Sequence, residues 1–321
     1  MKKYIKNIIH YDESDIRIDR WLRRKFNSLP QSLIEKKLRK GLIKLNNKIV
    51  KSNKKIKEND LIEIFDYHED NYSNKQLKKN IIKKIPDQII QKFRSSIIFE
   101  NDDYIILNKW KGIATQGGTK VLFSIDDIIK NLPETMNLVH RIEKETSGIL
   151  IIAKNYRSTR FFGSMFKEKK IKKIYIALCL GTPKKLKGKI KLRTANKTSK
   201  KNIKVKNDFS ETIFELLESN NEFSLIAFMP ITGKNHQIRI VAKNLGCPIL
   251  GDNKYGIYKN KKNKYFQKLL LHSFGIEFIS KDRRENYFAK FDVHTIDAFN
   301  KFQFKVPNEK KISNFFKKDL V

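Results

Sequence analysis

The sequence predicts an α+β protein with two domains of unequal size. Its 321 residues exceed one average domain, and 40% of them are apolar, which is enough for a substantial core. Short β-branched runs with period-two alternation are mixed with stretches that repeat apolar residues at helical spacing. A polar, lysine-rich stretch at 69–95 indicates a linker. We therefore expect a small domain at 1–68, a larger domain at 96–308 and a mobile tail at 309–321.

The composition of the chain indicates the cellular compartment in which the protein works. No apolar run approaches the roughly 20 residues of a membrane span, and the N-terminus lacks the apolar core of a signal peptide. The two cysteines, Cys179 and Cys247, lie far apart in sequence. This usage is typical of a reducing cytosol without disulfides, and it excludes a cysteine-rich zinc cluster. We expect a cytoplasmic protein without membrane contact.

The net charge of +35 and the pI near 10.0 indicate a polyanionic partner, most simply nucleic acid. Lysine, asparagine and isoleucine are abundant throughout the chain, as expected for an AT-rich coding sequence. The position of the charge is therefore more informative than its sum.

The small domain combines helical and strand patterns. Apolar residues recur at helical spacing from Ile18 to Phe26, and a second helix is expected at 31–40, with Gly41 as its C-terminal cap. Residues 42–50 predict a hairpin around two consecutive asparagines, and 61–65 predict a further strand.

Basic residues dominate the small domain from Arg17 to Lys57, where only Asp19 and Glu35 oppose them. Five of the chain's thirteen arginines lie in this span, and a lysine-rich composition does not explain arginines. A two-helix basic face beside a hairpin suits phosphate contacts on structured RNA, and the alternative is a solvated basic helix face. The predicted RNA-binding residues are Arg17, Arg20, Arg24, Lys36, Arg39 and Lys40.

The segment from His140 to Lys154 is the strongest candidate for chemistry in the larger domain. Glu143 follows two residues after Arg141, and the expected turn at 146–148 leads into an apolar run at 149–153 that predicts a buried strand. A polar loop that enters a core strand is held rigidly, as a catalytic carboxylate requires. The alternative is a surface turn with a solvated glutamate.

Two further segments carry candidate functional residues. Alternation at 173–180 places Lys173 and Tyr175 on one strand face, where they could contact a base and a phosphate; the alternative is a tyrosine that faces solvent. The expected helix after Thr232 buries one apolar face and leaves His236, Arg239 and Lys243 on an exposed face. An arginine there can pair with a nearby carboxylate. Other expected elements are a hairpin at 97–107, helices at 126–132 and 155–170, and strands at 223–229 and 269–272.

Four motifs in one order make the larger domain resemble the pseudouridine synthases of the RluA type over residues 96–295. The K-P-x-G motif corresponds to Lys109 to Gly112, and the H-R-L-D-x-x-T-S-G motif corresponds to His140 to Gly148. The K-x-Y-x-A-L motif corresponds to Lys173 to Leu178. The T-G-R-T-H-Q-I-R motif corresponds to Thr232 to Arg239, and its later G-D-x-x-Y-G part corresponds to Gly251 to Gly256. The N-terminal segment resembles the small RNA-binding domain named after a ribosomal small-subunit protein of the S-four type. Its R-x-D-x-x-L and G-x-I-x-x-N patterns stand as Arg17 to Leu22 and Gly41 to Asn46. The layout is most similar to the large-subunit rRNA enzymes, first the C-type and then the D-type.

The resemblance implies a mixed, largely antiparallel sheet with flanking helices and an enzyme that isomerises specific uridines to pseudouridine without cofactor or metal. It implies large-subunit ribosomal RNA or its assembly intermediates as partner, and we expect a monomer. Glu143 would act at the sugar or remove its proton, Arg239 would pair with Glu143, and Tyr175 would stack on the uracil. The implied substrate-binding residues are Arg141, His140, Lys173, His236 and Lys109.

One departure from the family pattern concerns the carboxylate itself. Glu143 stands where the family has aspartate, which lengthens the side chain by about 1.3–1.5 Å. A misplacement of about 1 Å can cost about 100-fold in rate. The alternative function is therefore a catalytically impaired RNA-binding relative, such as a ribosome assembly factor.

Overall fold

The chain forms two compact units, residues 1–82 and 83–321. The computed structural model describes residues 3–26, 29–68, 72, 85–118, 121–193, 209–256 and 268–317. Each unit is described by itself. Among these residues, no helix combines the length and the apolar composition needed to cross a membrane.

The smaller unit packs two short helices against a three-stranded antiparallel sheet of order β1-β3-β2. Trp21, Leu22, Ile34 and Leu38 are buried against the sheet, as their helical spacing predicts. Its elements are β1 (Lys3–Ile8), the 3-10 helix η1 (Tyr11–Glu13), α1 (Ile18–Lys25), α2 (Gln31–Arg39), β2 (Ile43–Leu45) and β3 (Leu61–Tyr67).

The predicted hairpin of the smaller unit is only partly confirmed. Asn46 and Asn47 both have positive φ, which a tight turn after β2 requires. However, β2 pairs with β3, and only an isolated bridge links Leu45 to Lys48. The predicted turn at the two asparagines is therefore present, but β2 pairs with β3 and not with the segment that directly follows the turn.

The larger unit is built on a ten-stranded sheet among its described residues. The main path runs β4-β5-β7-β12-β8-β11-β10-β9, with β13 paired to β12 and β6 paired to β7. Among the strands that the structure describes, only β7 and β12 pair in parallel, which confirms the predicted mixed, largely antiparallel sheet. The strands are β4 (Ile97–Glu100), β5 (Tyr104–Lys109), β6 (Asn137–Leu138), β7 (Ser147–Ala153), β8 (Lys172–Leu180), β9 (Lys187–Arg193), β10 (Phe209–Ser219), β11 (Phe223–Pro230), β12 (Leu271–Ser280) and β13 (Arg283–Phe288).

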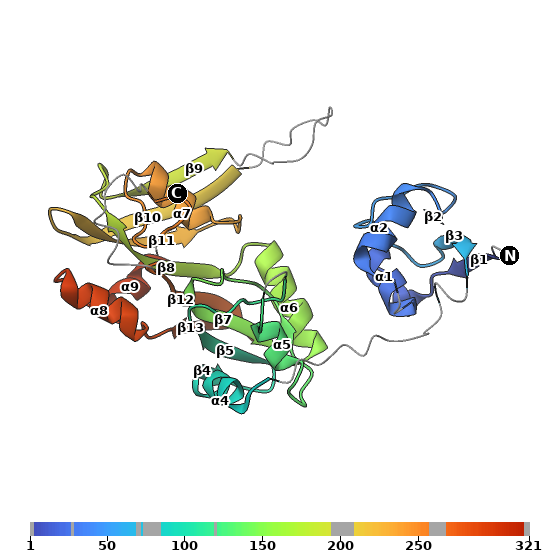
Figure 1. The fold of residues 1–321 in the computed structure, drawn as a ribbon, viewed down its shortest axis with the longest axis horizontal. Helices are drawn as coiled ribbons and strands as arrows, with labels where there is room; N and C mark the ends of the chain where they lie inside the picture. The colour runs from blue at the N-terminus through green and yellow to red at the C-terminus, as the bar shows by residue number, and fades with distance from the viewer. Residues whose placement is uncertain are drawn as a thin grey trace. The chain divides into compact units, whose positions relative to one another are not determined.

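Helices flank the sheet along its whole length (Figure 1). Around β5 and β7, α6 packs in one hydrophobic cluster, while α4 and α5 pack in another. Around β8 and β11, α7 packs in one cluster, while α8 and α9 pack in another. The helices are α4 (Asp87–Ser95), α5 (Ile125–Ile129), α6 (Tyr156–Lys167), α7 (Gln237–Asn244), α8 (Val293–Lys301) and α9 (Glu309–Phe316).

Two predicted boundaries are wrong where the structure describes them. The predicted linker at 69–95 contains α4, whose Phe93 is buried in the core of the larger unit; residues 69–71 and 73–84 lie outside the described residues. The predicted mobile tail at 309–321 contains α9, which buries Ile312 and Phe316; residues 318–321 lie outside the described part. In both segments a few buried apolar residues anchor a helix. The segments were predicted to be unstructured because most of the surrounding residues are polar or charged.

Shortening the buried aromatic side chain of α9 should destabilise the larger unit. Phe316 is 1% exposed and packs against Phe288. We expect Phe316→Ala to lower the free energy of unfolding by about 3–4 kcal/mol. Urea unfolding followed by near-UV circular dichroism measures this loss. Asn314→Ala, on the exposed side of the same helix, is the control. An unchanged midpoint for Phe316→Ala would mean that α9 does not contribute to the core.

Candidate active site

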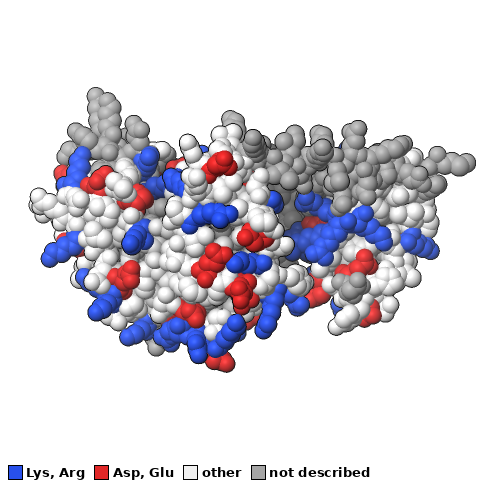
Figure 2. Space-filling view, turned by 90° about the horizontal axis from the view of Figure 1, so that it is seen from below, with Lys and Arg blue, Asp and Glu red and all other residues white. Residues whose placement is uncertain are grey.

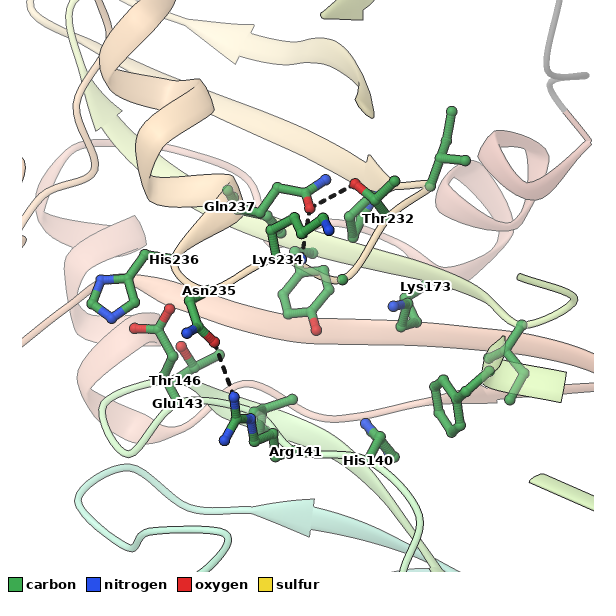
Figure 3. Close-up of a pocket in the computed structure, with 18 of the residues that line it drawn as sticks. His140, Arg141, Glu143, Thr146, Lys173, Thr232, Lys234, Asn235, His236 and Gln237 are labelled. Carbon is green, nitrogen blue, oxygen red and sulfur yellow. Dashed lines mark hydrogen bonds between the residues drawn. The ribbon is translucent and has the colours of Figure 1, made fainter. Parts of the chain in front are cut away.

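A cavity of about 870 Å³ lies in the larger unit, between the segment that precedes β7 and the loop that precedes α7. Figure 3 shows the labelled side chains of the 232–237 loop on one side of this space and those of His140, Arg141 and Glu143 on the other. The cavity therefore brings together three of the four motifs, which the sequence separates by up to about 100 residues. Its polar lining includes His140, Arg141, Glu143, Thr146, Lys173, Tyr175, Thr232, Lys234, Asn235, His236 and Gln237.

A three-membered ion cluster fixes the carboxylate of Glu143 at the cavity wall. Arg239 on α7 donates from Nη1 to Glu143 Oε2 at 2.6 Å. Its Nε and Nη2 donate to the two carboxylate oxygens of Asp252, at 2.8 and 2.6 Å. Burial disfavours the charged guanidinium, but the hydrogen bonds to Asp252 and Glu143 outweigh it and raise the pKa of Arg239. The predicted pairing of Arg239 with Glu143 is therefore present in the structure.

Asp252 lies within the G-D-x-x-Y-G motif at 251–256, but no role was predicted for it from the sequence. Its side chain is 1% exposed. Burial alone would raise the pKa of Asp252, but the hydrogen bonds from Arg239 and from the backbone N–H groups of Tyr255 and Lys254 lower it. The turn thus holds a buried carboxylate in the charged form that Arg239 requires.

The backbone on both sides of Glu143 is also held. Thr115 Oγ1 donates to Ile142 O at 2.7 Å and accepts from Ile142 N at 3.2 Å. Gly148, five residues beyond Glu143, has φ +105° and lies so close to β12 that a Cβ there would stand 2.2 Å from Ser273 O. Only glycine fits this contact, which anchors the end of the loop.

Lys109 does not line the cavity, in contrast to the prediction that it binds substrate. Its side chain is buried, and its Nζ donates to the carbonyl oxygens of Trp110, Ile113 and Lys144 at 3.0–3.3 Å. Gly112 N also donates to Lys144 O, at 2.9 Å. Burial lowers the pKa of Lys109 to about 7. Because Lys144 follows Glu143 directly, Lys109 holds the loop that carries Glu143 in place.

His140 and Tyr175 enter the cavity as uncharged groups. His140 Nε2 accepts a hydrogen bond from Ile151 N at 2.8 Å, and its ring packs on Phe166 with 4.6 Å between the centroids. Burial, with a smaller contribution from Lys173, lowers the pKa of His140 to about 3. Burial also raises the pKa of Tyr175 to about 12, and the charge of Glu143 adds to this effect. At neutral pH both groups are therefore neutral.

His236 and Arg239 were predicted to lie on an exposed face of α7, and neither does so in the structure. His236 has φ +55° and precedes the helix, and its ring meets that of Tyr255 edge to face at 5.5 Å. The Arg239 side chain is only 11% exposed, because it is turned toward the two carboxylates. Arg141, in contrast, is exposed, and its Nη2 donates to Asn235 Oδ1 at 3.0 Å (Figure 3).

Gln237 was also missed by the sequence analysis, although it shapes this loop. Its Oε1 accepts from Thr232 Oγ1 at 2.8 Å and from Lys234 N at 2.9 Å. Its Nε2 donates to Glu211 O and to Thr212 Oγ1. The side chain therefore ties the cavity wall to β10, and only its place in the motif hinted at a role.

Most of the predicted RNA-binding residues of the smaller unit lie on an exposed basic surface. Figure 2 shows Lys and Arg side chains gathered densely on this unit. Arg17 is the exception, because it donates from Nε and Nη2 to the buried Asp19, at 3.1 and 2.5 Å, and is thus partly committed to the fold. The exposed members of the predicted set are Arg20, Arg24, Lys36, Arg39 and Lys40.

Comparison with known proteins assigns the fold and its cavity to a class of enzymes that modify RNA. The family profile described as RNA pseudouridylate synthase matches residues 103–244, and the S4 domain profile matches residues 16–62. A relative named ribosomal large subunit pseudouridine synthase C, from Rickettsia bellii, is 39% identical over 80% of this chain and 87% of its own length. A protein of the same name from Buchnera aphidicola is 36% identical over 84% of this chain and 88% of its own length. The chain belongs to the RNA pseudouridylate synthase family.

A solved structure supports the fold assignment independently. Human RNA Pseudouridylate Synthase Domain Containing 4 superimposes with a TM-score of 0.59 at 20% identity, covering 69% of this chain and 98% of that one. The relatives extend the likeness over both units, which agrees with the two-domain resemblance found in the sequence.

Neutralising Asp252 should loosen the ion cluster. Asp252→Asn removes one of the two negative charges that balance Arg239, and we expect it to lower the free energy of unfolding by about 3 kcal/mol. We also expect slower turnover, because the guanidinium loses its two-point attachment. Thermal unfolding and single-turnover pseudouridine formation measure the two effects, with the exposed Asp297→Asn as control. If both quantities stay at the wild-type level, Asp252 does not orient Arg239.

Proposed function

We propose that this RNA pseudouridine synthase isomerises uridines in large-subunit ribosomal RNA, with Glu143 as the catalytic carboxylate. The observation that carries this proposal is the contact of Arg239 with both Glu143 and Asp252 at the wall of the cavity. The names of the relatives, which specify the ribosomal large subunit, support the choice of substrate RNA. The basic surface of the smaller unit, within its S4 match, supports contact with structured RNA.

The reaction breaks the uracil N1–C1′ bond, turns the base and joins it to the sugar again through C5. The target uridine must leave its stack, which costs a few kcal/mol. Arg141, which is exposed and lines the cavity, would occupy the gap that the base leaves. Tyr175 offers a neutral ring for stacking within the cavity, and Glu143 acts at the sugar or on one of its protons.

The longer side chain of Glu143 is compatible with this role. Its carboxylate reaches Arg239 at 2.6 Å, so the additional methylene does not separate the ion pair. The Rickettsia bellii and Buchnera aphidicola relatives are both named as synthases, which supports an enzyme rather than a binding-only protein. We therefore favour an active enzyme over the impaired relative.

We propose further that the protein works in the cytoplasm as a monomer. Each unit has its own hydrophobic core among the described residues, so neither requires a second copy to bury apolar side chains. Size-exclusion chromatography with light scattering tests the monomer, and a mass of twice 37.9 kDa would contradict it.

Replacing the carboxylate by an amide should abolish turnover. Glu143→Gln keeps the shape of the side chain but removes its charge, and we expect at least a 100-fold loss of rate, on the order expected for a catalytic acid or base. RNA affinity should stay within about twofold, because the phosphate contacts remain. Chemical labelling of pseudouridine in transcribed rRNA fragments measures turnover, and filter binding measures affinity. Undiminished conversion by Glu143→Gln would remove this residue from the mechanism.

Shortening the side chain tests whether the site is fitted to glutamate. Glu143→Asp withdraws the carboxylate by about 1.3–1.5 Å from Arg239, and we expect a rate loss of up to about 100-fold. The same assay gives the rate, and Glu145→Asp, two residues away and exposed, is the matched control. A faster Glu143→Asp enzyme would show instead that the additional methylene is a handicap.

A further inference from the structure

Lys173 is a cation inside the cavity without a negative partner. It lies on β8 and lines the cavity together with Tyr175, two residues away on the same strand face. Figure 3 shows its side chain reaching into the space between the 232–237 loop and His140. Its Nζ lies over the Phe166 ring, 5.8 Å from the ring centroid. Within the described parts of the chain, no carboxylate pairs with this ammonium group.

The other charged groups that determine the geometry of the cavity are already committed. Glu143 binds Arg239, Arg239 binds Asp252, and Arg141 donates to Asn235. His140, the neighbour of Lys173, is neutral at physiological pH. Burial lowers the pKa of Lys173, and no acidic side chain offsets that effect. Burying an unpaired cation destabilises the free protein. Such a charge is expected where a bound ligand supplies the missing negative partner.

The position of Lys173 favours the base as that ligand. Residues two apart on a strand are separated by about 7 Å, so a ring stacked on Tyr175 lies within reach of the Lys173 ammonium group. Phosphate groups stay in solvent when a nucleotide is turned inward, and the exposed Lys167 and Lys169 at the same cavity are better placed to meet them. The ammonium group therefore faces the part of the nucleotide that enters the cavity.

We propose that Lys173 is a catalytic residue whose ammonium group donates to a carbonyl oxygen of the inserted uracil and stabilises the negative charge that develops on the base. This proposal rests on the proposed function. When the N1–C1′ bond breaks, its electron pair stays on the uracil and is delocalised over N1, O2 and O4. The electron-poor sugar is compensated by Glu143, which bonds to it or removes its proton.

The same interaction persists until the base is rejoined. The electron pair on the ring forms the C5–C1′ bond. In the covalent route the bond between Glu143 and the sugar breaks at this step, and in the proton-removal route Glu143 returns the proton to the sugar. The proton then leaves C5, and N1 gains one. Lys173 donates a hydrogen bond throughout and needs no net proton transfer. A preorganised cation that meets charge only as it develops lowers the barrier more than it strengthens ground-state binding.

The test separates contact with the base from contact with phosphate. Lys173→Met keeps most of the volume and removes the charge, and we expect single-turnover rates at saturating RNA to fall at least 100-fold. The salt dependence of RNA affinity should stay unchanged, because no phosphate contact is lost. Lys167→Met, at the exposed side of the cavity, is the reference for a phosphate contact and should lower the salt slope by about one. Lys310→Met on α9 is the control for both quantities.

Two further measurements guard against a purely structural explanation. Lys173→Arg keeps the charge and should recover part of the rate, and thermal unfolding of Lys173→Met should show no loss of stability, since an unpaired cation has been removed. An unchanged rate for Lys173→Met, or a salt slope reduced by about one, overturns the proposal. If the wild type forms no pseudouridine, the proposed function fails, and the salt slopes alone decide whether Lys173 contacts phosphate.

Discussion

The arrangement of Glu143, Arg239 and Asp252 is the constraint on which the site depends. A guanidinium is planar and carries its donors in a fixed fork, so binding Nε and Nη2 to one carboxylate determines where Nη1 points. In this structure Nη1 points to Glu143. A lysine at the position of Arg239 would supply the same charge without that direction. The turn that carries Asp252 therefore determines, through Arg239, where the carboxylate of Glu143 is held.

The loop that carries Glu143 is held by hydrogen bonds on both sides of this residue. Lys109 and Gly112 donate to Lys144 O on one side, and Thr115 binds both backbone groups of Ile142 on the other. The loop then enters β7, whose Gly148 lies against Ser273 of β12 where these two strands pair in parallel. A loop fixed in this way suits catalysis, because reactive groups must hold their geometry to within about 0.5 Å.

The sequence was most informative where periodicity and motif agreed. The face shared by Lys173 and Tyr175 follows from strand alternation, and the pairing of Glu143 with Arg239 follows from the family resemblance. The errors have one physical cause, which is that residue type does not reveal burial. Lys109 was predicted to contact substrate, although it is buried at the end of β5 and donates to three carbonyl oxygens. Asp252 was given no role, although its buried carboxylate binds Arg239. The same limit hid α4 and α9, where short apolar sets lie among many lysines.

The substitution of aspartate by glutamate becomes understandable once these constraints are combined. Asp252 determines where the guanidinium of Arg239 lies, and the backbone clamps determine where the Cα of residue 143 lies. The side chain has only to bridge the remaining gap, and glutamate bridges it with a hydrogen bond of 2.6 Å. What the site requires at position 143 is therefore a carboxylate at a given point in the cavity, and either acidic residue can supply it if the loop backbone shifts by about one carbon–carbon bond. A shift of the loop backbone cannot, however, substitute for the orientation of the Arg239 guanidinium, which Asp252 determines.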